Sequence, residues 1–222
     1  MRKPGPREFV ARLKRLDCCA VSDALDKLHL VGVVLGLAPL TSTRRIAGRV
    51  LTIKLGVGEP PPGKPRHIGT TAIESAEPGD IIVVEQRSGV HAASWGGILA
   101  LGAKLRRIAG VIADGPARDI DEAREHDFPV FARGATPVTA RGRIVELANN
   151  VPVAIGDIEV RPGDYVIADA SGVAFISAVN IETVLATAEE ISRREAAMVR
   201  ALRKGRPITE VMGATYENML KG

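Results

Sequence analysis

The chain has 222 residues, enough for one large domain with a substantial core. That core must be aliphatic, because hydrophobic residues make up 45% of the chain and aromatic residues only 3%. The formal net charge of +4 permits an acidic small molecule or an RNA partner and identifies neither. The basic residues that end the helix expected over residues 181–202 have few aromatic neighbours for stacking bases, which favours a solvated face over nucleic-acid binding. No stretch resembles a signal peptide or a membrane span, so we expect a cytoplasmic protein without a membrane partner.

The N-terminal part of the chain predicts helix followed by strand. Residues 8–28 carry apolar residues at helical spacing, and Ser22-Asp23 is a candidate cap for a second helix within that span. Residues 44–55 (RRIAGRVLTIKL) alternate in part and are rich in β-branched residues, which predicts a strand.

A loop rich in proline and glycine follows over residues 56–69 (GVGEPPPGKPRHIG). It contains Lys64, Arg66 and His67, which suit an anionic ligand but also suit an ordinary solvated loop. The residue pattern alone leaves both interpretations open.

The centre of the chain, residues 94–119 (SWGGILALGAKLRRIAGVIADGPARD), predicts a turn, a helix, a strand and a second turn. The strand is expected over residues 111–113, and Asp114-Gly115-Pro116 is strong turn punctuation. Since ligands bind at the carboxyl ends of strands in α/β sheets, both turns are candidates for a site.

Strands and helices alternate up to residue 135, after which residues 136–176 are rich in short β-type runs. Residues 181–202 predict a long helix, and residues 209–220 predict a short terminal one. No linker or low-complexity tract divides the chain, so we expect a single α/β domain over residues 1–222.

The motif DGPARD carries the first candidate chemistry. The planar guanidinium of Arg118 suits a carboxylate, and Asp119 is a hard oxygen ligand suited to Mg²⁺ or Mn²⁺. The alternative is structural, with Asp119 capping the helix expected over residues 120–126 and Arg118 solvated.

The motif SWGG carries the second candidate chemistry. Gly96 and Gly97 open a helix, where free backbone N–H groups and the helix dipole favour an anion, so the amides of Ile98 and Leu99 are candidates for holding a carboxylate. The alternative is an ordinary turn in which glycine avoids a steric clash. Dinucleotide-binding, phosphate-loop and nucleophile-elbow motifs are absent, and the histidines lack metal-ligand spacing.

Several segments together resemble the RraA-like family, which includes 4-hydroxy-4-methyl-2-oxoglutarate and 4-carboxy-4-hydroxy-2-oxoadipate aldolases and the regulator of ribonuclease E activity. The resemblance is carried by WGGILALGAK, RIAGVIADGPARD and FPVFARG, and extends to VSDALDKL near the start and AEEISRREA near the end. It covers nearly the whole chain.

The resemblance implies an α/β sandwich around a mixed β core, of the swivelling-domain type, with a long C-terminal helix. It also implies homotrimers or hexamers with active sites between subunits. The implied activity is a class II, metal-dependent pyruvate aldolase with oxaloacetate decarboxylase activity, acting on small 2-oxo acids. The family's other implied function is a protein regulator that binds and inhibits an enzyme of the ribonuclease E type.

Family roles carried over to this sequence place a divalent cation, Mg²⁺ or Mn²⁺, on Asp119 and the substrate's oxo-acid end on Arg118, which also steadies the enolate. Asp114 is expected beside the site, where it orders water. A glutamate of the next subunit completes the site, with Glu195 as the better match and Glu190 as the second.

The substrate carboxylate is expected on the backbone of a four-residue turn, Gly96, Gly97, Ile98 and Leu99. This chain departs from the family at one of these positions. Many members have an acidic residue where Gly97 stands. If that carboxylate moves protons, its loss should impair aldol cleavage more than decarboxylation, because only the former must remove a hydroxyl proton.

Overall fold

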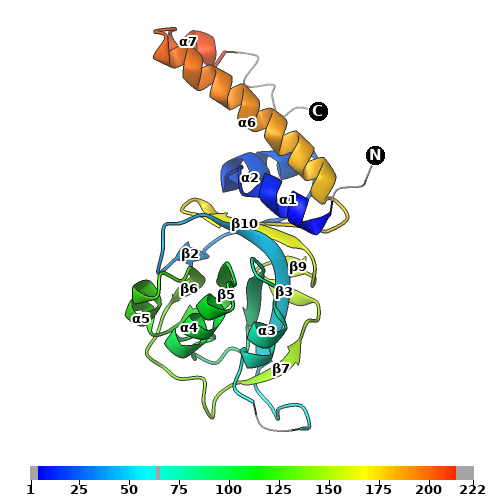
Figure 1. Ribbon diagram of the computed structural model, residues 1–222, viewed down its shortest axis with the longest axis vertical. Coiled ribbons are helices and arrows are strands. Elements are labelled where there is room, and N and C mark those ends of the chain that lie inside the picture. The colour runs from blue at the N-terminus through cyan, green and yellow to red at the C-terminus, as the bar shows by residue number, and fades with distance from the viewer. Residues whose placement is uncertain (1–4, 64–65, 214–222) are drawn as a thin grey trace.

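The computed structural model describes residues 5–63 and 66–213 and has a mixed α/β architecture built on one large sheet (Figure 1). Nine strands form this sheet, in the order β1-β11-β10-β3-β4-β5-β6-β2, with β7 paired to β3 as well. The α/β class and the long C-terminal helix expected from the sequence are therefore confirmed.

The middle of the sheet is parallel. It consists of β3 (Ile46–Gly56), β4 (Ile81–Gln86), β5 (Gly110–Ala117) and β6 (Val130–Ala135). Antiparallel strands complete the sheet: β1 (Val33–Val34), β2 (Ala38–Pro39), β7 (Val145–Asn149), β10 (Tyr165–Asp169) and β11 (Gly172–Ile176). A separate hairpin pairs β8 (Val153–Ile155) with β9 (Ile158–Val160).

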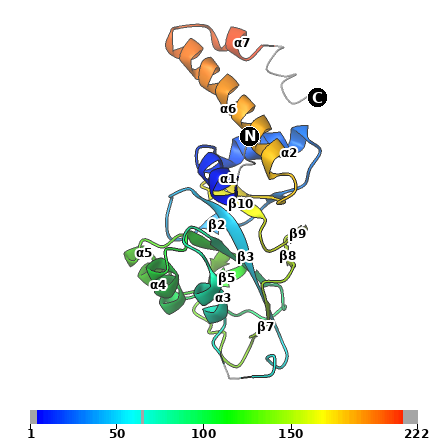
Figure 2. The same ribbon diagram turned by 45° about the vertical axis from the view of Figure 1, so that its right-hand side comes forward.

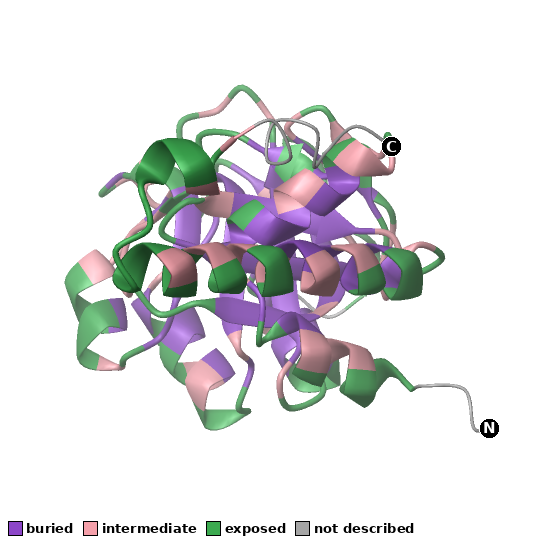
Figure 3. Cartoon of the chain, turned by 90° about the horizontal axis from the view of Figure 1, so that it is seen from above, coloured by how far each residue is buried: buried purple, intermediate pink, exposed green. Residues whose placement is uncertain are grey.

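Both faces of the parallel strands are covered, which explains their nearly continuous apolar sequence. Along β4, Ile82 and Val84 face one core cluster while Ile81 and Val83 face another. The first cluster lies under α3 (Thr70–Ser75), α4 (Gly97–Leu105) and α5 (Ile120–Glu125), which Figure 2 shows together on one side of the sheet, whereas the second includes the hairpin β8–β9. Figure 3 shows buried residues concentrated in the central strands.

A third layer consists of α1 (Pro6–Leu13), α2 (Cys18–Lys27) and α6 (Ile181–Arg203), packed against β10 and β11. The buried residues of α6 end at Ile191, and its second half projects away from the sheet with the short α7 (Ile208–Val211) at its tip (Figure 1). None of the helices in the described part of the chain has the length and apolarity needed to cross a membrane.

Two local predictions were wrong. The N-terminal helical region breaks at residues 14–17 rather than at Ser22-Asp23, because the carboxylate of Asp17 caps α2 by accepting the Ala20 N–H over 2.8 Å. The expected turn at residues 114–116 belongs to β5 instead, where an irregularity in its register with β6 accommodates it. Most of the expected terminal helix, residues 214–220, lies outside the described residues.

Candidate active site

The segment before α4 and the end of β5, with the Arg118-Asp119 turn that follows it, lie side by side. The backbone N–H of Arg118 donates to the Trp95 carbonyl over 2.9 Å. Both the N–H and the hydroxyl of Ser94 donate to the Pro116 carbonyl, each over 2.8 Å. Three hydrogen bonds therefore fix the start of α4 against the turn that leads into α5.

Asp119 links the two turns through its side chain. It occupies the left-handed backbone region, with φ of 54°, which aspartate tolerates better than most residues. Its Oδ2 accepts the Gly97 N–H over 3.0 Å, and its Oδ1 accepts Arg118 Nε over 2.9 Å. Asp119 stands at the cap position of α5 without a capping bond there, so the structural role expected for it is wrong in one respect: it caps α4 instead.

The guanidinium of Arg118 is hydrogen-bonded at Nε but not at its terminal nitrogens, within the described part of the chain. Its side chain is 35% exposed, and the contact of Nε with Asp119 fixes the plane of the guanidinium. The terminal nitrogens have no hydrogen-bond partner among the described residues. Two parallel N–H donors therefore remain for a planar anion such as a carboxylate or an enolate.

The start of α4 supplies backbone donors. Its first intrahelical bond runs from the Ala100 N–H to the Gly96 carbonyl over 2.9 Å, so the N–H groups of Ile98 and Leu99 have no acceptor within the helix. The Gly97 N–H is already taken by Asp119. A Cβ on Gly96 would lie 2.8 Å from Asp119 Oδ2, so a side chain at this position would displace the Asp119 carboxylate.

A cavity of about 500 Å³ brings these groups together. Its walls come from the start of α4, from the turn containing Arg118 and Asp119, from the loop before α3, and from the segment between β6 and β7. Two lining residues, Glu122 and Arg141, were not predicted from the sequence. Glu122 lies in the first turn of α5, three residues after Asp119, and Arg141 belongs to no motif, so no pattern of the sequence marks either residue as part of a site.

The loop over residues 56–69 contributes His67 to this cavity. The pKa of His67 is lowered, first by partial loss of solvation and then by the positive charge of Arg141, so its imidazole is neutral at pH 7. Arg66 instead lines a neighbouring cavity of about 690 Å³, and its Nη1 donates to the Thr71 hydroxyl over 3.3 Å. Lys64 lies outside the described residues.

Asp114 is placed differently from the other predicted residues. Its carboxylate is buried, accepts Arg133 Nε over 2.6 Å and the Gly156 N–H over 2.7 Å, and does not line the cavity. These bonds tie the hairpin β8–β9 to the central sheet. The catalytic role expected for Asp114 stays a prediction, and its visible contacts are structural.

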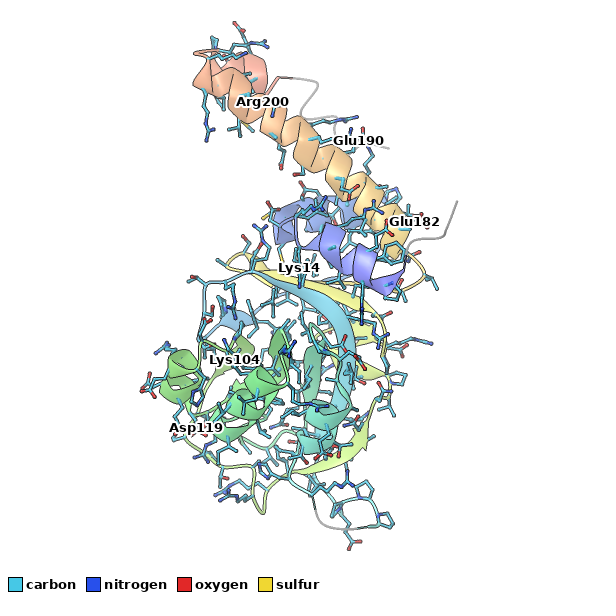
Figure 4. The ribbon with its side chains drawn as sticks, viewed as in Figure 1. Lys14, Lys104, Asp119, Glu182, Glu190 and Arg200 are labelled. Carbon is cyan, nitrogen blue, oxygen red and sulfur yellow. The ribbon has the colours of Figure 1, made fainter. Side chains whose placement is uncertain are left out.

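Glu190 and Glu195 lie on α6, far from the cavity of their own chain. Figure 4 shows Asp119 in the body of the molecule and Glu190 on the projecting helix at the other end. The pKa of Glu195 is raised by desolvation and by the nearby carboxylates of Asp17 and Asp23, which places it against α2. Neither glutamate can therefore join Arg118 and Asp119 within one chain.

The residues at the cavity fit a loosely held, hydrated cation rather than a closed metal cage. No cluster of three or more metal-binding side chains occurs among the described residues. Asp119 is 28% exposed at the cavity, and each of its oxygens makes one hydrogen bond and keeps a lone pair. Mg²⁺ is commonly bound in this way, by one or two carboxylates with water filling the other positions.

The chain belongs to the RraA-like family: the family model described as Aldolase/RraA matches residues 18–175, well over half of the chain. Arg118 and Asp119 fall inside that match, and α6 falls outside it.

Relatives and solved structures agree with this assignment. A protein of Halalkalibacterium halodurans named "Putative 4-hydroxy-4-methyl-2-oxoglutarate aldolase" is 30% identical over 196 residues, which cover 88% of this chain and 89% of that protein. An uncharacterized protein from Pseudomonas syringae superposes with a TM-score of 0.83 at 27% identity, covering 96% of this chain and all of the other. RraAS2 of Streptomyces coelicolor, described as an unusual member of the RNase ES inhibitor RraA family, gives 0.74 at 24% identity over 88% of this chain and 97% of the other, which supports the fold alone.

Proposed function

We propose that the protein is a divalent-metal-dependent lyase that cleaves a C–C bond of small 2-oxo acids and releases pyruvate. The observation that carries this proposal is the arrangement at one cavity of the open guanidinium of Arg118, the carboxylate of Asp119 and the free amides of α4. The aldolase name of the relative from H. halodurans supports the same reaction class.

Each group has a role in this reaction. The Ile98 and Leu99 amides and the positive end of the α4 dipole bind the carboxylate next to the oxo group. Arg118 donates to the oxo oxygen, where negative charge grows as the C–C bond breaks, and because Asp119 already fixes its plane, little reorganisation is needed. Asp119 would hold Mg²⁺ or Mn²⁺, which supplies Lewis acidity when bound.

We also propose that the active unit is a homotrimer or a pair of trimers in which Glu195 serves the cavity of a neighbouring chain. Its position on α6, no residue of which lines the cavity of its own chain, supports this arrangement. The exposed apolar side chains at the projecting end of α6, on α7 and directly after it suit contact with another protein surface: Val199, Leu202, Ile208 and Met212.

The same exposed surface supports a second candidate function, a regulator that binds an RNA-degrading enzyme. It differs from the first in what the cavity should do. A regulator needs no open guanidinium beside a carboxylate, so the two functions separate on whether Arg118 matters to activity.

The deciding experiment is pyruvate release, followed by a coupled lactate dehydrogenase assay, from 4-hydroxy-4-methyl-2-oxoglutarate and from oxaloacetate. We expect turnover with Mg²⁺ or Mn²⁺, abolition by excess chelator and recovery on adding metal, measured against enzyme-free blanks containing the same metal. Full turnover in excess chelator would exclude the metal assignment, and no turnover of either substrate would exclude the lyase.

A further inference from the structure

We propose that Arg141 is a specificity-determining residue of this site, and that its guanidinium binds the second carboxylate of a 2-oxo dicarboxylic acid, the one attached to carbon 4. The inference rests on the proposed lyase function and concerns recognition of the half of the substrate that leaves. Three observations support it: the place of Arg141 between two cavities, its lack of an intramolecular partner, and the charges of the other lining residues.

The cavity that contains Arg118 and Asp119 adjoins the neighbouring cavity of about 690 Å³, here called the distal cavity. The distal cavity is otherwise walled by residues 60–63 of the proline-rich loop, by α3 and by β7. A substrate whose oxo-acid end lies at the start of α4 therefore has room to extend toward the wall that the two cavities share. Four residues line both cavities: His67, Ile68, Ala140 and Arg141.

The charge of Arg141 is not used by the fold. Its backbone N–H donates to the Thr139 hydroxyl over 3.3 Å, but its side chain has no hydrogen bond and no ion pair among the described residues. The carboxylate that lines the distal cavity, that of Glu146, already has partners: Oε2 accepts the Gly69 N–H over 2.6 Å and Oε1 accepts Asn149 Nδ2 over 3.3 Å. The guanidinium therefore remains available to an anion.

The other charges of the first cavity leave the second carboxylate to Arg141. The α4 amides and Arg118 hold the oxo-acid end in the proposed reaction, and the carboxylates of Asp119 and Glu122 repel an anion. His67 is neutral at pH 7, because desolvation and the charge of Arg141 lower its pKa. Among the described residues that line this cavity, Arg141 is therefore the cation without a role.

The chemistry of the side chain suits this assignment. A guanidinium presents two parallel N–H donors that match the two oxygens of a carboxylate. A hydrogen bond between charged groups changes affinity by about tenfold or more. Because Arg141 is exposed in the free chain, we expect the lower end of that range.

The test compares two substrates that share every reacting atom. In 4-hydroxy-4-methyl-2-oxopentanoate, a methyl group replaces the second carboxylate of 4-hydroxy-4-methyl-2-oxoglutarate, and cleavage of either releases pyruvate. We expect the wild-type protein to have the higher kcat/KM for the dicarboxylate. Arg141→Gln should lower that kcat/KM about tenfold, chiefly through KM, and change the value for the monocarboxylate by no more than about twofold.

Two further variants control for indirect effects. Arg143→Gln is the matched control, because Arg143 is exposed on the same segment and lines neither cavity, so the preference for the dicarboxylate should persist. Arg141→Lys keeps the charge but loses the paired donors, and it should retain part of the preference. Melting temperatures of the three variants should match that of the wild-type protein, since both positions are exposed.

A binding measurement separates this inference from the lyase function. 2-Oxoglutarate and 2-oxopentanoate lack the C4 hydroxyl that aldol cleavage requires, and they differ only in the second carboxylate. Isothermal titration in the presence of Mg²⁺ should give the lower Kd for 2-oxoglutarate in the wild-type protein. In Arg141→Gln that Kd should rise about tenfold, while the Kd of 2-oxopentanoate stays unchanged.

Each contrary result has its own meaning. Equal losses for both members of a pair, no loss in Arg141→Gln, or a wild-type protein without preference for the dicarboxylates would overturn the role of Arg141 and leave the lyase standing. Pyruvate release from no substrate, together with a selective loss of 2-oxoglutarate binding in Arg141→Gln, would overturn the lyase and leave Arg141 as a carboxylate-binding residue.

Discussion

The side chain of Asp119 has two roles. Its carboxylate caps α4 through the Gly97 N–H and also fixes Arg118, while facing the cavity where a cation is proposed. A capping bond needs only an acceptor oxygen, whereas cation binding needs the negative charge. Substitution can therefore separate the capping role of Asp119 from its proposed role in cation binding.

The first prediction concerns Asp119→Asn. Asparagine tolerates the left-handed backbone and can still accept the Gly97 N–H, so we expect the melting temperature to change little and the metal-dependent activity to be lost. Asp119→Ala removes the cap as well and should lower the melting temperature by roughly 2–4 °C, corresponding to about 1 kcal/mol. Calorimetry and the pyruvate assay on both variants measure this, and an active Asp119→Asn protein would remove Asp119 from the cation site.

The second prediction is that Arg118→Lys is not a conservative change. Lysine keeps the charge but loses both the Nε contact to Asp119 and the two parallel terminal donors. We expect kcat/KM for pyruvate release to fall about a hundredfold, the scale of a removed transition-state donor. Arg124→Lys, on the exposed side of α5, is the control, and near-normal kinetics in Arg118→Lys would make Arg118 a surface residue without function.

At the scale of elements, α6 is held to the molecule by its first half only. Its apolar residues up to Ile191 pack with α1 and α2, and Glu189 accepts Arg12 Nε over 2.7 Å and Arg12 Nη2 over 2.9 Å. This two-pronged pair lies partly exposed between α1 and α6. The orientation of the projecting half, and with it the position of Glu195, therefore depends on a few contacts near the start of the helix.

The third prediction follows from that pair. Hydrogen bonding to Arg12 lowers the pKa of Glu189, against a smaller desolvation effect that raises it, so its stabilisation is complete at neutral pH. It is lost as the pH falls below the ordinary pKa of glutamate and through the lower folded value. We expect Glu189→Gln to cost about 0.5–1 kcal/mol at pH 7, because the pair is partly exposed, and to cost nothing once the wild-type carboxylate is protonated.

Denaturant unfolding of both proteins from pH 7 down to pH 3 gives the difference directly. A cost that stays constant over this range would mean that Glu189 stabilises the helix by packing rather than by charge. Glu190→Gln is a suitable comparison, since Glu190 pairs with Arg194, a neighbour on the exposed side of the same helix.

At the scale of the whole molecule, the candidate catalytic residues lie in two separate parts of the structure. The cavity is lined by Arg118 and Asp119, while Glu195 lies on α6 near the carboxylates of Asp17 and Asp23. A closed oligomer brings unlike surfaces of neighbouring chains together, so a site completed by a neighbour follows naturally from a ring of three.

The fourth prediction tests that arrangement by complementation. Arg118→Ala and Glu195→Ala should each be inactive, and an equal mixture reassembled into trimers should recover about a quarter of wild-type activity, because a quarter of the interfaces pair two intact residues. Subunit exchange is verified with two affinity tags. No recovery despite exchange would mean that Glu195 serves no active site.

Local sequence patterns were sufficient to predict several of the helices and strands. Residues 44–55 alternate and are β-branched, and they form β3; residues 181–202 repeat apolar residues at helical spacing, and they form α6. The turn containing Arg118 and Asp119 was predicted as a candidate site because its residue types suit anion and cation binding. Such features depend on residues that are close together along the sequence, so they can be predicted from it.

Tertiary structure decided the rest, because the deciding contacts join residues far apart in the chain. The sequence presents Asp119 as a cap for its own helix, yet the helix it caps begins 22 residues earlier, at Gly97. Asp114 stands in the same motif, but Arg133 and Gly156 bind its carboxylate in the interior. From the sequence, Gly97 is only a position without an acidic side chain. In the structure, the packing of α5 against α4 places the side chain of Glu122 in the space that a side chain of residue 97 would occupy.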